Sequence, residues 1–120
     1  MRDLETNEIE VAAEQVMAGR RTDARRGDVD GGETAIGWVK SCACEDDIRA
    51  IAEGEREALD VLAEYEDWTP DYQELGLRSR EAYDEGVNIG FRAQIGRAWK
   101  AITKKMHEKK KEAKYCAKVG

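Results

Sequence analysis

The residues best suited to chemistry are three cysteines and the single histidine, which together have the atoms of a zinc site. Cys42, Cys44, His107 and Cys116 would make a Cys₃His ligand set. The spacing argues against it, because structural zinc sites draw on pairs such as Cys-x₂-Cys, and only one residue separates Cys42 from Cys44. An odd number of cysteines without a disulfide framework favours reduced thiols in a cytosol. We therefore expect a cytoplasmic protein with no metal and no cofactor.

Other patterns for catalysis are weaker still. His107 stands in the run Met-His-Glu-Lys-Lys-Lys, where a solvated position is expected. Gly86, Gly90 and Gly96 lie inside a helical pattern without a preceding strand, so they do not form a phosphate loop. In a chain with 26 acidic residues, pairs of carboxylates carry no signal for acid-base chemistry. We therefore expect no catalytic residues and no enzyme.

Length and composition predict one small helical domain over residues 1–120. Ala, Glu, Lys, Leu and Arg make up 57 of the 120 residues, a composition typical of long helices. No run without a charge exceeds six residues, whereas a membrane span needs about 20 mostly apolar residues. The predicted class is all-α, a small antiparallel bundle of three to four helices, with no membrane contact.

Periodicity, caps and breakers divide the chain into five predicted segments. They are an N-terminal helix over 1–19, a flexible connector over 20–33, an acidic helix over 45–68, a short helix over 70–75 and a long basic C-terminal helix over 79–115. Thr69 is the expected N-cap of the short helix, and Gly76 is expected to end it. The sequence leaves open whether the first 32 residues pack on the bundle.

The long C-terminal helix carries the clearest amphipathic pattern. Its apolar stripe consists of Tyr83, Val87, Phe91, Ile95, Trp99, Ile102 and Met106, and contact with the core is expected to end near Met106. Beside it lies a line of small residues, including Ala82, Gly86 and Gly90, which would let another helix approach closely. A structural subunit that self-associates through this line is one functional alternative.

Charge is sorted along the chain. Residues 41–90 have 4 basic and 15 acidic side chains, a net charge of −11, whereas residues 91–120 have 10 and 2, a net charge of +8. The acids of the predicted middle helix align on one face, called here the acidic rail. Its members are Asp46, Glu53, Glu57, Asp60, Glu64 and Asp67.

The rail favours a protein partner with a basic surface. Trp68 and Tyr72 are candidate aromatic anchors beside it, since aromatic side chains dominate the energetics of interfaces. The predicted function is a non-enzymatic regulator or inhibitor that occupies a partner's surface, for example a phage or mobile-element accessory protein that blocks a host nucleic-acid machine. The alternative is a nucleic-acid-binding accessory protein using Arg97, Lys100, Lys104 and Lys111 of the basic helix.

Overall fold

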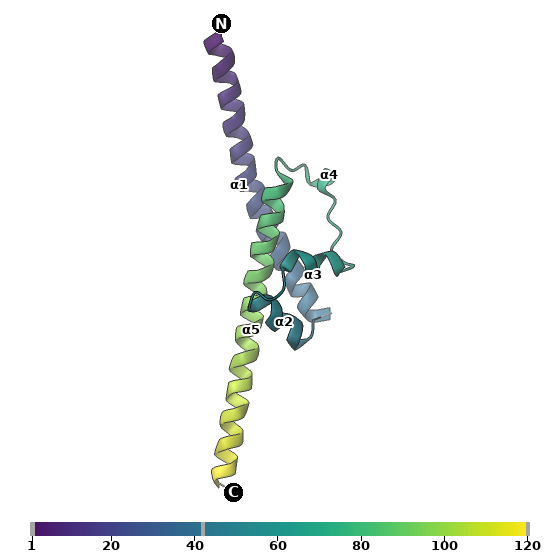
Figure 1. Cartoon of the computed structure of the whole chain (residues 1–120), viewed down its shortest axis with the longest axis vertical. Helices are drawn as coiled ribbons and strands as arrows, with labels where there is room; N and C mark the ends of the chain where they lie inside the picture. Colours follow the sequence, from purple (N-terminus) through teal and green to yellow (C-terminus); the bar gives the residue numbers. More distant parts are fainter. Residues whose placement is uncertain (1, 42, 120) are drawn as a thin grey trace.

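The computed structural model describes residues 2–41 and 43–119, with side chains described over 7–41 and 43–110. These residues form five helices: α1 (Arg2–Ser41), α2 (Glu45–Ala52), α3 (Ala58–Glu64), α4 (Tyr72–Leu75) and α5 (Arg80–Val119). The described residues contain no strand, which confirms the predicted all-α class. The molecule is 89 Å long and 28 by 20 Å across, with its two termini at opposite ends (Figure 1).

Helix α1 passes without a break through residues 20–33, so the predicted flexible connector is wrong. The prediction failed because residues 20–33 are mostly charged residues and glycines, and they lack the periodic apolar residues from which an amphipathic helix is recognised in a sequence. Gly27, Gly31 and Gly32 are nevertheless buried, because this part of α1 packs against α5. That packing offsets the roughly 1 kcal/mol by which a glycine weakens an isolated helix. The N-terminal helix predicted over 1–19 therefore continues to Ser41.

Glycines on both long helices let α1 and α5 touch backbone to backbone. A Cβ atom added at Gly27 would overlap the carbonyl oxygen of Tyr83, and one added at Gly86 would overlap the carbonyl oxygen of Ala24. Two further glycines lie equally close to the opposite backbone. The set, called here the glycine crossing, consists of Gly27, Gly31, Gly86 and Gly90.

The glycine crossing occupies the small-residue line of α5 inside the chain. Ala82, Gly86 and Gly90 are all buried, with both glycines against α1. This line is therefore not a free surface for self-association, as the sequence-based alternative required, because α1 of the same chain already covers it.

The register of the crossing shows that α1 and α5 run in the same direction. Gly27 meets the backbone of Tyr83 and Gly31 meets the backbone of Val87, so both helices advance together by four residues. Figure 1 shows the two helices descending side by side. The prediction of an antiparallel bundle does not describe this pair of helices.

Antiparallel packing holds instead between α1 and the segment that returns from its end to the start of α5. Gly37 lies beside the hydroxyl of Tyr65, and Gly19 lies beside the side chain of Arg78. The returning segment therefore runs in the direction opposite to α1. Helices joined by short loops pack antiparallel. Here residues 42–79 separate the two long helices, which is enough chain to return to the start.

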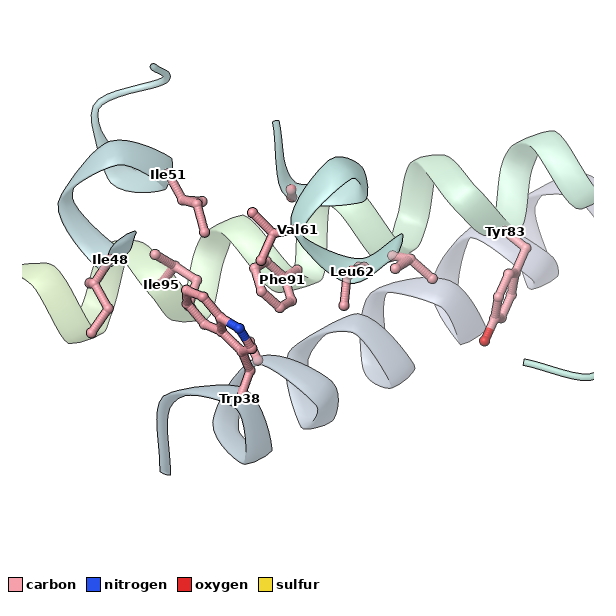
Figure 2. Close-up of a cluster of buried hydrophobic side chains, with 11 residues drawn as sticks. Trp38, Ile48, Ile51, Val61, Leu62, Tyr83, Phe91 and Ile95 are labelled. Carbon is pink, nitrogen blue, oxygen red and sulfur yellow. The ribbon is translucent and has the colours of Figure 1, made fainter. Parts of the chain in front are cut away.

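The core lies between α5, the second half of α1 and the short helices α2 and α3 (Figure 2). Its buried members are Ala35, Trp38, Ile48, Ile51, Ala58, Val61, Leu62, Tyr83, Val87, Phe91 and Ile95. The Trp38 and Phe91 rings pack with centroids 5.6 Å apart. Along α5, which confirms the long helix predicted over 79–115, Trp99 and Ile102 are partly buried and Met106 is 40% exposed. Core contact thus ends near Met106, as predicted.

The single acidic helix predicted over 45–68 is wrong, because the chain turns after α2. Gly54 has a φ of +80°, the left-handed conformation that commonly ends helices. Its amide donates to the carbonyl of Ile51 at 3.1 Å, and the amide of Glu55 donates to the carbonyl of Ala50 at 2.8 Å. This pair of bonds is a Schellman motif, and it separates α2 from α3.

The short helix predicted before Gly76 is present as α4, although it begins later than expected. Its N-cap is Asp71 and not Thr69, because the Asp71 carboxylate accepts hydrogen bonds from the amides of Gln73 and Glu74, both at 3.2 Å. Gly76 ends the helix as predicted, with a φ of +62°.

Candidate interaction surface

The start of α5 is held against α1 by a buried carboxylate. The amide of Ser79 donates to Asp23 Oδ2 at 2.7 Å, and the Ser79 hydroxyl accepts from the amide of Ala82 at 3.1 Å. Arg20 of α1 donates to the same hydroxyl at 3.2 Å. Asp23 is only 7% exposed. This cluster fixes the point of α1 at which the returning segment ends and α5 begins.

A cleft of about 550 Å³ opens between α1 and the returning segment, and is called here the acidic cleft. Its charged lining residues are Arg26, Asp30, Glu33, Asp67, Asp71 and Glu74. Trp68 and Tyr83 contribute aromatic surface to the same lining. Five carboxylates against one guanidinium give the cleft a negative charge.

Three of these six charged groups have structural partners inside the chain. Arg26 donates to the carbonyl of Leu75 at 2.9 Å, and Asp71 caps α4. Asp30 accepts a hydrogen bond from the Tyr83 hydroxyl at 2.6 Å. The other three, Glu33, Asp67 and Glu74, are exposed and form no ion pair with any described side chain. The cleft therefore has three carboxylates available to a ligand.

Tyr83, the residue of α5 that lines the acidic cleft, packs against a second tyrosine from α4. Tyr72 and Tyr83 meet edge to face with ring centroids 6.0 Å apart. Burial, followed by the hydrogen bond to Asp30, raises the pKa of Tyr83 well above its ordinary value of 10.0. Burial and a 2.9 Å hydrogen bond to Asp84 also raise the pKa of Tyr72, and the guanidinium of Arg80 lies 3.8 Å above the Tyr72 ring. Tyr72 is thus committed to structural contacts.

The acidic rail is not one line, because its members are divided between α2, α3 and the turns around them. Asp46, Glu57 and Asp60 are exposed and form no ion pair with the described side chains. Asp67 is the rail member that lies in the acidic cleft, next to the partly buried Trp68. The structure therefore brings Asp67 and Trp68 together but not the rail as a whole.

Two rail carboxylates are paired with arginines. Glu53 binds Arg49 at 2.9 Å, and Glu64 binds Arg56 at 2.7 Å. The hydrogen bond to Glu53, together with the nearby charge of Glu55, raises the pKa of Arg49. Two of the six carboxylates of the acidic rail are therefore paired with arginines of the same chain.

The basic residues of the alternative nucleic-acid surface follow one side of α5. Arg97, Lys100 and Lys104 are exposed, and none forms an ion pair within the described part of the chain. The side chain of Lys111 lies outside the described residues. Counted at 100° per residue, all four fall within about 60° of one another on the helix.

Two of the four residues considered for metal binding lie outside the described part. Cys42 and the side chain of Cys116 belong to the parts not described, and His107 is exposed. The thiol of Cys44 is exposed and lies 3.0 Å from Asp47 Oδ2. Among the described residues, no group of three or more His, Cys, Asp or Glu side chains is placed to hold a metal ion.

Sequence reasoning missed the contribution of α1 to this surface, namely Asp23, Arg26, Asp30 and Glu33. A signal for it was present. Gly27-x₃-Gly31 in the supposed connector has the same spacing as Gly86-x₃-Gly90, and matched glycine pairs indicate two helices in close contact. Asp23 and Asp30 flank the first pair seven residues apart, on the side that would face the partner helix.

Comparison of the chain with protein families, with curated proteins and with solved structures finds no match. Within the described residues, no helix combines the length and apolar character needed to cross a membrane.

Proposed function

We propose that this chain is a non-enzymatic binding protein that acts by occupying a basic surface of another protein. The observation that supports this function is the acidic cleft, which is lined by carboxylates from α1 and from the returning segment together with the partly buried Trp68. An arginine or lysine side chain of the partner is the complementary group.

The chemistry of the cleft suits a cationic side chain in two ways. Glu33, Asp67 and Glu74 supply carboxylate oxygens for charge-assisted hydrogen bonds. The indole of Trp68 supplies a face over which a cation is attracted by about 0.5–1 kcal/mol at an exposed site. The side chains of Tyr72 and Asp71 form hydrogen bonds within the chain, so we assign them a structural role. We assign recognition of the partner to the three free carboxylates and Trp68.

The test compares two variants with equal changes in charge. The cleft variant is Glu33→Lys, Asp67→Lys and Glu74→Lys, and the rail variant is Asp46→Lys, Glu57→Lys and Asp60→Lys. Immobilised wild-type protein should capture a stoichiometric protein from nuclease-treated lysate of its host. The cleft variant should lose that protein and the rail variant should retain it, with circular dichroism showing equal helicity.

A second readout uses a defined probe, a synthetic lysine-rich peptide titrated by isothermal calorimetry. We expect the cleft variant to raise the dissociation constant about tenfold or more, a loss of at least about 1.4 kcal/mol. A smaller change is expected in the rail variant. Equal binding by wild-type protein and both variants would contradict a role for the cleft.

The exposed side of α5 supports a second candidate function, nucleic-acid binding. Arg97, Lys100 and Lys104 lie on one side of the helix without internal partners among the described side chains. Binding through them would weaken steeply with salt, because each phosphate contact releases condensed counterions. Titration of a labelled duplex at several salt concentrations tests this alternative, and binding that does not depend on salt contradicts it.

A further inference from the structure

The long helices extend beyond the body of the molecule at both ends (Figure 1). Residues 2–18 of α1, called here the N-terminal arm, and residues 104–119 of α5, called the C-terminal arm, each project for about 25 Å at 1.5 Å per residue. Every described side chain in them, from 7 to 18 and from 104 to 110, is exposed. Helices of this length without tertiary contacts are marginal in water, so both arms call for a partner.

The two arms have opposite charges. The N-terminal arm contains one basic and five acidic residues, a net charge of −4, and the C-terminal arm contains seven basic and two acidic residues, a net charge of +5. Like charges stand at i, i+4 in each, as in Glu10 with Glu14 and Lys105 with Lys109, and such pairs destabilise an isolated helix. The helix dipole favours acidic residues in the first turn of a helix and basic residues in the last turn. These four residues lie outside those turns, so the dipole does not account for their charges.

Each arm also exposes apolar surface between its charges, a pair of residues on the N-terminal arm and one described methionine on the C-terminal arm. Ile9 and Val16 on the N-terminal arm are 66% and 41% exposed, seven residues apart on one side of α1. On the C-terminal arm, Met106 is 40% exposed and is flanked in projection by Lys105 and Lys110. On the N-terminal arm this spacing is typical of a helix packed against one other helix, and Met106 is the exposed apolar contact that the C-terminal arm offers.

We propose that the N-terminal arm of one copy of this chain packs lengthwise on the C-terminal arm of a second copy. Ile9 and Val16 then cover Met106, with the acidic residues of one arm beside the lysines of the other. The arms match in length and complement each other in charge. They cannot pair within one chain, because they leave at opposite ends of an 89 Å molecule.

Charge reversal of each arm provides the test. The acid-reversed variant is Glu8→Lys, Glu10→Lys and Glu14→Lys, and the base-reversed variant is Lys105→Glu, Lys109→Glu and Lys110→Glu. In sedimentation velocity at low salt, wild-type protein should show at least twice the mass of the 13.5 kDa chain and should dissociate at high salt. Each variant alone should be monomeric, and an equimolar mixture should form a complex that contains both.

The rail variant described above is the control, since it changes three charges in the body and should assemble like wild-type protein. The reversed residues are exposed and outside the core, so circular dichroism and thermal unfolding of the body should change little. A monomeric wild-type protein, or a mixture that behaves as the sum of its parts, would overturn the proposal. Assembly that disappears on nuclease treatment and is sensitive to the lysine changes alone would assign the C-terminal arm to nucleic acid instead.

Discussion

Residues 7–18 and residues 23–38 belong to the same helix, yet only the second group contains residues that are buried against the rest of the chain. The exposed group has the higher share of apolar side chains, among them Ile9, Val11, Val16 and Met17, although Trp38 of the second group is larger than any of these. The second group is densely charged and has four glycines. Apolar content therefore does not decide which half of α1 packs. The half that packs is the one whose missing side chains allow another backbone to approach.

The largest expected effect separates the core face of α5 from its arm. Phe91→Ala should lower the free energy of unfolding by about 3–5 kcal/mol, because the fully buried ring leaves a cavity beside Trp38. Met106→Ala, on the same stripe but exposed, should cost no more than about 0.5 kcal/mol at high salt, where the proposed pairing of the arms is dissociated. Urea unfolding at high salt, followed by circular dichroism, measures both. Similar losses under these conditions would mean that Met106 packs within its own chain.

The next effect isolates the glycine crossing. Gly86→Ala should destabilise the protein by roughly 3 kcal/mol, because the added Cβ meets the backbone of α1, which cannot move aside as a flexible side chain can. Gly96→Ala is the matched control in the same helix. No heavy atom lies within 4 Å of its added Cβ, so it should stabilise by up to about 1 kcal/mol through helix propensity. Thermal unfolding that moves both variants in one direction would contradict this account of the crossing.

A smaller effect is expected at the anchor between α1 and α5. Asp23→Ala removes the acceptor of the Ser79 amide and should cost about 1–3 kcal/mol. Glu14→Ala, a carboxylate lost from the exposed part of the same helix, should change stability by less than about 0.5 kcal/mol. Hydrogen exchange gives a direct reading, since the Ser79 amide should lose protection only in the Asp23 variant.

The smallest expected effect depends on pH. Tyr83 has a raised pKa in the folded protein, so above its ordinary value of 10.0 the unfolded chain loses this proton before the folded chain does. Stability is therefore fully present below pH 10 and falls as the pH rises beyond it. Tyr83→Phe should cost about 1 kcal/mol at neutral pH through the lost bond to Asp30. It should also make the alkaline decline shallower in urea titrations. If the Tyr83→Phe variant loses stability above pH 10 as steeply as wild-type protein, another group is responsible for the alkaline loss of stability.

The sequence predicted those parts of the fold in which apolar periodicity and packing agree. The stripe from Tyr83 to Ile95 is the core because it is periodic over several turns, and Gly76 ends α4 because glycine adopts a positive φ easily. Residues 20–33 were mispredicted because the contacts that stabilise them come from residues about 60 positions away in the chain. Local patterns cannot show such compensation.

The candidate site was predictable only in part, for a related reason. Asp67 and Trp68 were found from charge and residue type within their own segment. Asp30 and Glu33 lie on the opposite wall of the acidic cleft, and the contact between the walls depends on the parallel pairing of α1 with α5. The pairing itself depends on glycines of both helices, and those of α1 were taken from the sequence as part of a connector between helices.

The parallel pairing of α1 with α5 has a consequence for the order in which the chain folds. Two antiparallel helices joined by a short loop can form their first contacts between residues that are close in sequence. Here the contact of Gly31 with Val87 forms only when the long loop between them closes. Contacts of large sequence separation slow folding relative to ordinary helical bundles. During synthesis, the middle of α1 leaves the ribosome with its backbone face uncovered until most of the chain has followed.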